Sequence, residues 1–209
     1  MKLGVLISGR GSNLQAIARA CAAKAIPAEI ALVLSNRPNA PGLEWARQQG
    51  LKACALASAG REREEYDREL VAKLRDAGVE LVCLAGYMRL LSGYFIAAYP
   101  NRILNIHPSL LPAFPGLDAQ QQALEYGVKF SGCTVHFVDD TLDGGPVILQ
   151  AVVPVLEGDD VAALSARILA EEHRLYPHAI GLLARGKIAV AGRRVKTEGG
   201  GAGENRTHE

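Results

Sequence analysis

An asparagine and a histidine, Asn105 and His107, stand two residues apart in the sequence. Residues 102–104, Arg-Ile-Leu, precede them and indicate a buried strand, while Pro108, Pro112 and Pro115 exclude a helix or a central strand beyond it. Alternate residues of a strand share a face, so the carboxamide and the imidazole should point the same way. Ligands of open α/β sheets bind at the carboxyl ends of strands, so we predict that this pair lies in a binding site.

A second polar cluster, residues 139–146, follows an apolar strand at 134–138 and contains Asp143. We interpret Asn105, His107 and Asp143 as one constellation suited to acyl transfer. A carboxamide can donate to an oxyanion, which is typically worth about 10²–10³ in rate. An imidazole can move a proton, worth roughly 10²–10⁴, and a carboxylate nearby would hold the ring. The alternative is that His107 is a structural histidine.

No serine or cysteine stands in a nucleophile-elbow context, which favours direct attack by an amine over a covalent intermediate. His136 either lines the site or is a core histidine. Asp139 and Asp140 could be plain turn residues, and a metal site there is improbable because the spacing is not that of an EF-hand. For Glu172 and its neighbour His173, a solvated helix face is the plain interpretation.

Residues 9–13 form a glycine-containing turn between a strand at 2–8 and a helix that follows. Backbone N–H groups at a helix N-terminus favour anions, so Gly11, Ser12 and Asn13 could bind a phosphate. The pattern is neither a P-loop nor GxGxxG, and a tight structural turn is equally compatible with it. We expect Ser12 or Asn13 to cap the helix.

Strand and helix patterns alternate through the first half of the chain, which predicts a Rossmann-like, doubly wound parallel sheet. The second half differs, because the strands at 130–138 and 147–155 are joined by a short loop and must be antiparallel. A helix at 159–183 should be kinked or split by Pro177, and a short edge strand is expected at 188–195. We predict one α/β domain over residues 1–195, with halves at about 1–100 and 101–195, and a disordered tail at 196–209.

The composition argues against several classes of protein. The 209 residues carry 23 basic and 22 acidic side chains, a net charge of +1, which disfavours a nucleic-acid or membrane-surface protein. The apolar stretch at the N-terminus is too short for a signal peptide or a membrane helix. The four scattered cysteines indicate reduced core thiols and no zinc site, and hence a cytoplasmic protein. A monomer and a homodimer are equally compatible with the sequence.

Three motifs in the same order resemble the phosphoribosylglycinamide formyltransferase family: residues 7–17, residues 105–112, and residues 135–146. Residues 172–177, Glu-His-Arg-Leu-Tyr-Pro, also resemble a segment of that family. The resemblance spans roughly residues 1–190 and implies the formyltransferase fold. It further implies transfer of the formyl group of 10-formyltetrahydrofolate, a co-substrate, to the amine of glycinamide ribonucleotide in purine synthesis, without a metal.

The resemblance also implies a role for each matching residue. Asn105 and His107 would stabilise the oxyanion, with His107 as proton donor and Asp143 orienting it. Gly11, Ser12 and Asn13 would bind the ribonucleotide phosphate, and Glu172 the ribose. The folate would contact Arg63, Met88, Arg89, Leu90, Leu91, Asn105, Asp139, Asp140, Thr141, Leu142 and Asp143.

The chain departs from some relatives after residues 115–117, where Asp118 replaces a histidine and three glutamines follow at 120–122. A role for that histidine does not transfer, and Asp118 is expected to be a helix N-cap. Three other functions stay open. They are hydrolysis of formyltetrahydrofolate, formyl transfer to another amine, and a non-catalytic nucleotide-binding module that would not need Asn105, His107 and Asp143 together.

Overall fold

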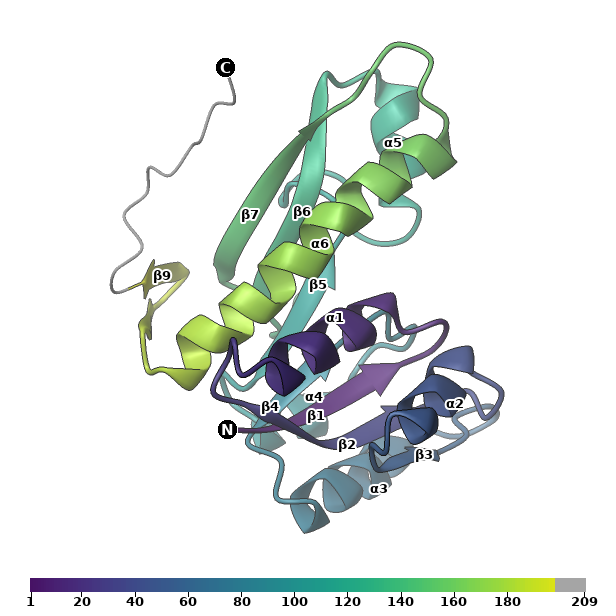
Figure 1. Cartoon of the computed structure of the whole chain (residues 1–209), viewed down its shortest axis with the longest axis vertical. Coiled ribbons are helices and arrows are strands. Elements are labelled where there is room, and N and C mark those ends of the chain that lie inside the picture. Colours follow the sequence, from purple (N-terminus) through teal and green to yellow (C-terminus); the bar gives the residue numbers. More distant parts are fainter. Residues whose placement is uncertain (198–209) are drawn as a thin grey trace.

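The chain is organised around a seven-stranded sheet with strand order β3-β2-β1-β4-β5-β6-β7 (Figure 1). The computed structural model describes residues 1–197. The strands of this sheet are β1 (Lys2–Ile7), β2 (Glu29–Ser35), β3 (Ala53–Ala55), β4 (Leu81–Leu84), β5 (Ile103–His107), β6 (Phe130–Phe137) and β7 (Val147–Pro154). The first five are parallel, and β6 and β7 are antiparallel to their neighbours. The predicted mostly parallel sheet with an antiparallel extension is confirmed.

The described helices pack on both faces of the sheet and against one another. They are α1 (Ser12–Ala22), α2 (Pro41–Gln48), α3 (Arg63–Asp76), α4 (Gly93–Ala98), α5 (Ala119–Tyr126) and α6 (Val161–Ala184). One apolar core joins α1, α2 and α6 to one face, and a second core joins α3 and α4 to the other. None of these described helices is long and apolar enough to cross a membrane.

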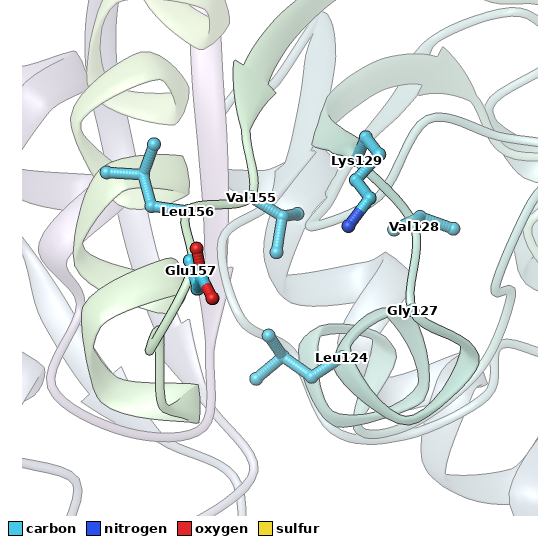
Figure 2. Close-up of a pocket in the computed structure, with 7 residues that line it drawn as sticks. All are labelled: Leu124, Gly127, Val128, Lys129, Val155, Leu156 and Glu157. Atoms are coloured by element: carbon cyan, nitrogen blue, oxygen red, sulfur yellow. The ribbon is translucent and has the colours of Figure 1, made fainter.

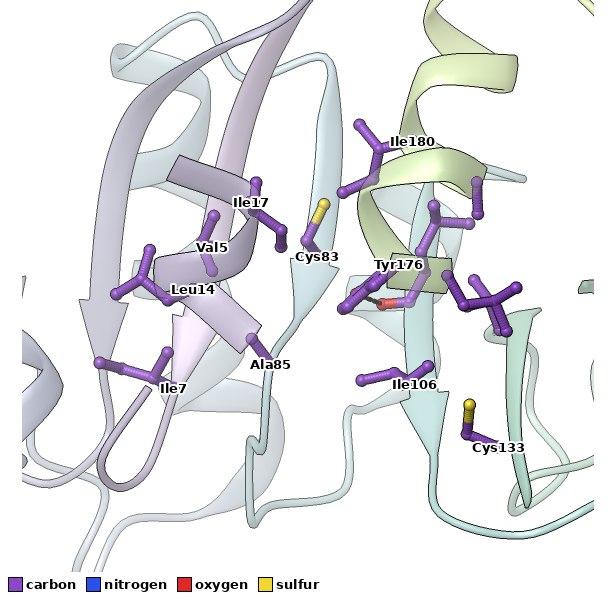
Figure 3. Close-up of a cluster of buried hydrophobic side chains, with 14 of the residues drawn as sticks. Val5, Ile7, Leu14, Ile17, Cys83, Ala85, Ile106, Cys133, Tyr176 and Ile180 are labelled. Carbon is purple, nitrogen blue, oxygen red and sulfur yellow. Dashed lines mark hydrogen bonds between the residues drawn. The ribbon is translucent and has the colours of Figure 1, made fainter. Parts of the chain in front are cut away.

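Tyr176 of α6 lies inside the larger core (Figure 3). This side chain is fully buried, and its hydroxyl lies 3.1 Å from the carbonyl oxygen of Leu84 and 2.9 Å from that of Leu104. Buried hydroxyls need such partners, because an unpaired polar group in an apolar core costs about 1–3 kcal/mol. The contact therefore fixes α6 over the junction of β4 and β5.

The two faces of the antiparallel half are packed differently, one against a helix and the other against loops. Helix α6 packs against β6 and β7 on one side (Figure 1), and Leu104 and Ile106 of β5 face its core. On the opposite side two loops, residues 108–118 and 138–146, lie over β5–β7 and bond to Thr134, Gln150 and His107. This loop-covered face is the one to which Asn105 and His107 point, because strand residues alternate between faces.

Two helix predictions are wrong in part. The N-cap of α1 is Gly11 with φ 73°, and no side chain caps the helix, because Asn13 is bonded instead to Glu172. Pro177 does not split α6, which runs unbroken from Val161 to Ala184. Buried residues on both sides of the proline, such as Ile168 and Ile180, pack into one core, so tertiary packing holds the helix across the missing hydrogen bond. Asp118 does occupy the N-cap position of α5, with φ 55°, but its side chain makes no capping bond.

The end of the described chain also differs from expectation. Residues 188–195 do not form one edge strand, because β8 (Ile188–Ala191) and β9 (Arg194–Thr197) pair as a separate antiparallel hairpin. Gly192 has φ 59°, which lets the chain turn there. The predicted disordered tail is therefore wrong for residues 196 and 197, and its residues 198–209 lie outside the described part. Of the four free cysteines, Cys83 and Cys133 are buried, but Cys21 and Cys54 are only half-buried.

Candidate active site

Four polar side chains share the loop-covered face of β5 and β6. Antiparallel pairing places Asn105 opposite His136 and His107 opposite Thr134. The side chains of directly paired strand residues lie close together on one face. The sequence placed Asn105 and His107 together by their spacing, but only the strand pairing adds His136 and Thr134.

His136 orients the carboxamide of Asn105. Its Nδ1 lies 2.8 Å from the carbonyl oxygen of Phe137, and since a carbonyl can only accept, Nδ1 carries a hydrogen. Burial lowers the pKa of His136, outweighing the raising effects of the Phe137 carbonyl and Asp143. The ring is therefore neutral near pH 7, and its Nε2 lone pair accepts from Nδ2 of Asn105 at 3.2 Å. The second N–H of the carboxamide stays free for a substrate.

His107 is held from both sides of its ring. Its Nε2 lies 2.8 Å from the carbonyl oxygen of Phe114, so this nitrogen donates and carries a hydrogen. Its Nδ1 lies 3.4 Å from Oδ2 of Asp143, and the ring is buried. Proton exchange with a substrate is thus left to Nδ1, on the side of the carboxylate.

Asp143 reaches the ring because its loop folds back over the sheet. Oδ2 accepts a hydrogen bond of 2.8 Å from the backbone N–H of Gly116, and Oδ1 lies 3.9 Å from Nε2 of His136. A Cβ on Gly145 would lie 1.9 Å from the carbonyl oxygen of Phe137, so only glycine permits this close approach. The structure thus places Asp143 beside His107, and Asn105 lies on the same face of the sheet beside His136.

The glycine turn forms a second polar region. Gly11 adopts φ 73° and opens α1, whose first turn has no side-chain cap, so backbone N–H groups are left for another acceptor. Nδ2 of Asn13 donates to Oε2 of Glu172 at 2.7 Å, and both residues are buried. Oδ1 of Asn13 is buried without a partner among the described residues. The solvated helix face considered for Glu172 is therefore wrong, and burial raises its pKa against the lowering effect of Asn13.

The segment after β4 is built on a polar network from other strand ends. The backbone N–H of Met88 donates to Oγ of Ser8 at 2.7 Å, and Ser8 donates to Asn36 at 2.6 Å. The guanidinium of Arg89 lies over the ring of Tyr66 and donates to the carbonyl oxygens of Ser58 and Arg61. Met88 and Leu90 are 58% and 55% exposed, so two apolar side chains of this segment face solvent.

The remaining residues implied by the resemblance are more loosely placed. Leu91 is half-buried, and Arg63 is exposed in the first turn of α3. Oδ1 of Asp139 accepts from the N–H of Thr141 at 2.9 Å, which is the turn role considered for it. Asp140, Thr141 and Leu142 are exposed on the same loop. Within residues 1–197, no group of three acidic, histidine or cysteine side chains could hold a metal ion.

A hollow of about 370 Å³ lies elsewhere, between the chain after α5 and the chain after β7 (Figure 2). Its lining residues are Leu124, Gly127, Val128, Lys129, Val155, Leu156 and Glu157, none of which was predicted as a site residue. The polar face described above, not this hollow, therefore defines the candidate active site.

Sequence reasoning missed the residues that support this site. The carbonyl of Phe114 and the side chains of Thr134, Gln150 and Ser8 hold the loops and rings in place. The available signal was a polar residue inside an otherwise apolar strand, such as Thr134 between Cys133 and Val135. That signal does not say which loop such a residue bonds.

The fold and the site define an α/β enzyme with a carboxamide, an imidazole and a carboxylate arranged for acyl transfer. Comparison with known proteins gives the family. The model described as formyl transferase matches residues 1–180, so the chain belongs to the formyl transferase family, and that prediction is confirmed. These enzymes transfer one-carbon groups, and membership implies a folate-type co-substrate.

Individual relatives agree with the family. The phosphoribosylglycinamide formyltransferase of Escherichia coli is 50% identical over 191 residues, covering 91% of this chain and 90% of its own length. The trifunctional purine biosynthetic protein adenosine-3 of Drosophila melanogaster is 47% identical, but the match covers only 14% of it. The crystal structure of glycinamide ribonucleotide transformylase 1 from Symbiobacterium toebii has a TM-score of 0.93 and 58% identity, covering 94% of this chain and 93% of that one.

Proposed function

We propose that this chain transfers the formyl group of 10-formyltetrahydrofolate to the amine of N1-(5-phospho-D-ribosyl)glycinamide, in de novo purine biosynthesis. The observation that carries the proposal is His107, held between the Phe114 carbonyl and Asp143 and lying beside the oriented carboxamide of Asn105. Formyl transfer needs these parts together: a donor for an oxyanion, a proton carrier, and a group that orients the carrier.

The geometry supports direct transfer. The amine of the ribonucleotide attacks the formyl carbon, and a C–N bond forms as the carbonyl oxygen becomes an oxyanion. The free N–H of Asn105 donates to that oxyanion. The bond from the formyl carbon to N10 of the folate then breaks, and the proton lost by the amine is passed to N10 through Nδ1 of His107. Asp143 stabilises the protonated ring while it holds that proton.

The ribonucleotide site rests on the glycine turn. The uncapped N-terminus of α1 suits a phosphate held by Gly11, Ser12 and Asn13, because its N–H groups and dipole both favour an anion. Glu172 would accept hydrogen bonds from the ribose hydroxyls, and Asn13 already fixes its carboxylate at 2.7 Å. The orphaned Oδ1 of Asn13 supports a hydroxyl-bearing ligand at the same place.

The folate site rests on exposed apolar side chains beside polar loops. Met88, Leu90 and Leu142 expose more than half of their surface, which a planar pterin would cover. The side chain of Arg89 already donates hydrogen bonds to the carbonyl oxygens of Ser58 and Arg61, so this residue would bind the folate through its backbone. Leu91, Arg63 and Asn105, with the loop of Asp139, Asp140, Thr141, Leu142 and Asp143, complete the proposed contacts.

The wider proposal is a single domain over residues 1–195, in a cytoplasmic monomer or homodimer that binds small molecules and neither nucleic acid nor membrane. The thiols, free throughout the described residues, support a reducing compartment. The near-zero net charge supports small-molecule partners over nucleic acid.

One assay tests the function. The purified chain is mixed with 10-formyltetrahydrofolate, with and without the ribonucleotide, and tetrahydrofolate and the formylated product are measured. Formation of both in equal amounts, only with the ribonucleotide, is expected. Release of formate without the acceptor would favour a hydrolase, and no reaction would favour a nucleotide-binding module.

A further inference from the structure

One loop holds both members of the His107–Asp143 pair through its backbone. The carbonyl oxygen of Phe114 accepts from Nε2 of His107 at 2.8 Å, and the N–H of Gly116 donates to Oδ2 of Asp143 at 2.8 Å. Displacing residues 114–116 would therefore release both side chains at once.

The backbone of this loop cannot form a regular series of strand-type hydrogen bonds with the sheet. Pro108, Pro112 and Pro115 have no N–H to donate, and Phe114 has φ 53°, a conformation that non-glycine residues rarely adopt. Such a segment keeps its shape only if the surrounding structure holds it.

Thr134 of β6 supplies much of that hold. Its buried hydroxyl donates to the carbonyl oxygen of Ser109 at 2.7 Å and accepts from the N–H of Leu111 at 3.0 Å. It also accepts from Nε2 of Gln150 at 3.0 Å. A hydroxyl has one hydrogen and two lone pairs. The Thr134 hydroxyl therefore uses all three in its hydrogen bonds to this loop and to Gln150.

Gln150 completes the network from the edge strand β7. Strand pairing places His107, Thr134 and Gln150 in one row across β5, β6 and β7. Besides bonding Thr134, the amide of Gln150 donates to the carbonyl oxygen of Leu111 at 2.9 Å. The row therefore connects an exposed residue at the sheet edge to the loop that orients the imidazole.

We propose that Thr134 and Gln150 are positioning residues for formyl transfer, which act by holding the 109–116 loop so that the Phe114 carbonyl fixes the tautomer of His107. With Nε2–H committed to that carbonyl, Nδ1 keeps its lone pair free to take up and release a proton, beside Asp143 and within reach of a substrate held by Asn105. Without Thr134 and Gln150 holding the loop, the ring also samples the tautomer protonated at Nδ1, in which Nδ1 cannot accept the proton that the amine loses. This inference rests on the proposed function for its kinetic consequence only.

The test uses three substitutions in the full chain. Thr134→Val removes the hydroxyl at nearly constant shape, Thr134→Ser retains it, and Gln150→Met removes the amide. Gln121→Met is the matched control, because Gln121 is an exposed glutamine on α5 that bonds only Glu125 among the described residues. Far-ultraviolet circular dichroism and thermal melts check that each variant is folded.

Two measurements are made on each variant. Nitrogen-15 NMR of the His107 ring, without substrates, should show a protonated Nε2 in the wild type and averaged nitrogens in Thr134→Val. Steady-state kinetics should show kcat lowered about 10-fold or more in Thr134→Val and about 3–10-fold in Gln150→Met, with KM for both substrates little changed. Thr134→Ser should restore both readings, and Gln121→Met should leave both unaltered.

The proposal is overturned if the His107 ring spectrum is the same in Thr134→Val, Gln150→Met and the wild type, or if Thr134→Ser loses as much kcat as Thr134→Val. If Thr134→Val does not fold, Gln150→Met decides, since that side chain is exposed. A wild type that transfers no formyl group would sink the proposed function, while the substrate-free ring spectrum would still decide this one.

Discussion

Nδ2 of Asn105 lies 3.2 Å from Nε2 of His136, and this contact decides how the carboxamide is presented. Because Nδ1 of His136 donates to a backbone carbonyl, Nε2 can only accept, and it fixes which end of the Asn105 amide carries the N–H groups. From the sequence, His136 could either line the site or be a core histidine. In the structure it contacts the Asn105 carboxamide directly.

Replacing His136 with phenylalanine should lower kcat about 10- to 100-fold, because the carboxamide can then rotate away from the oxyanion. KM for both substrates should change less, since ground-state contacts lie elsewhere. Steady-state kinetics measure the split. His136→Gln, whose side-chain oxygen can accept, should recover part of the rate, and a variant with unaltered kcat would contradict the role.

His107→Ala and Asp143→Asn should each cut kcat by at least about 10²-fold, because the first removes the proton carrier and the second removes the charge that stabilises its protonated ring. The far-ultraviolet spectrum should be unchanged. Asp76→Asn, the same change at an exposed residue at the end of α3 and outside the proposed sites, is the comparison for Asp143→Asn. Near-normal turnover in either site variant would refute the mechanism.

Glu172→Gln should raise the melting temperature at neutral pH while raising KM for the ribonucleotide. Burial raises the pKa of Glu172, so the folded state holds this proton to a higher pH than the unfolded chain does. Stability from this group is therefore present at low pH and lost as pH rises through the folded pKa. Glutamine has no charge to desolvate and can still accept from Asn13.

Thermal melts over a pH series test the sign of this effect. The gain in melting temperature should grow as pH rises toward neutral and be close to zero at about pH 3.5, where the carboxyl is largely protonated in both states. A variant less stable than the wild type at neutral pH would show that the charged form is compensated within the fold.

Gly145→Ala should lower kcat by about 10-fold or more, because a Cβ there would meet the carbonyl of Phe137 and push the Asp143 loop off the sheet. Gly93→Ala is the matched control, since a Cβ at Gly93 meets nothing within 4 Å. Kinetics of both variants are compared. Equal activity of the two would mean that the loop tolerates the displacement.

Local patterns in the sequence determined most of the fold. The alternation of apolar runs with helical periods predicted the parallel half, and the short link between the strands of 130–138 and 147–155 predicted their antiparallel pairing. Both hold because hydrophobic period and loop length act on neighbouring residues. The same logic failed at Pro177 and at residues 188–197, where packing of distant residues and a glycine turn decided the outcome.

The sequence by itself also put Asn105 and His107 on one face and grouped Asp143 with them, and its resemblance to a family implied a role for each residue. Only the tertiary structure brought Asp143 to within 3.4 Å of the ring, set the Phe114 carbonyl against its other nitrogen, and buried Glu172 beside Asn13. The physical reason is that the alternation of faces along a strand depends only on neighbouring residues, so it can be recognised in the sequence. A contact between two segments that are not part of one element depends on how whole strands pair and how loops fold back over them.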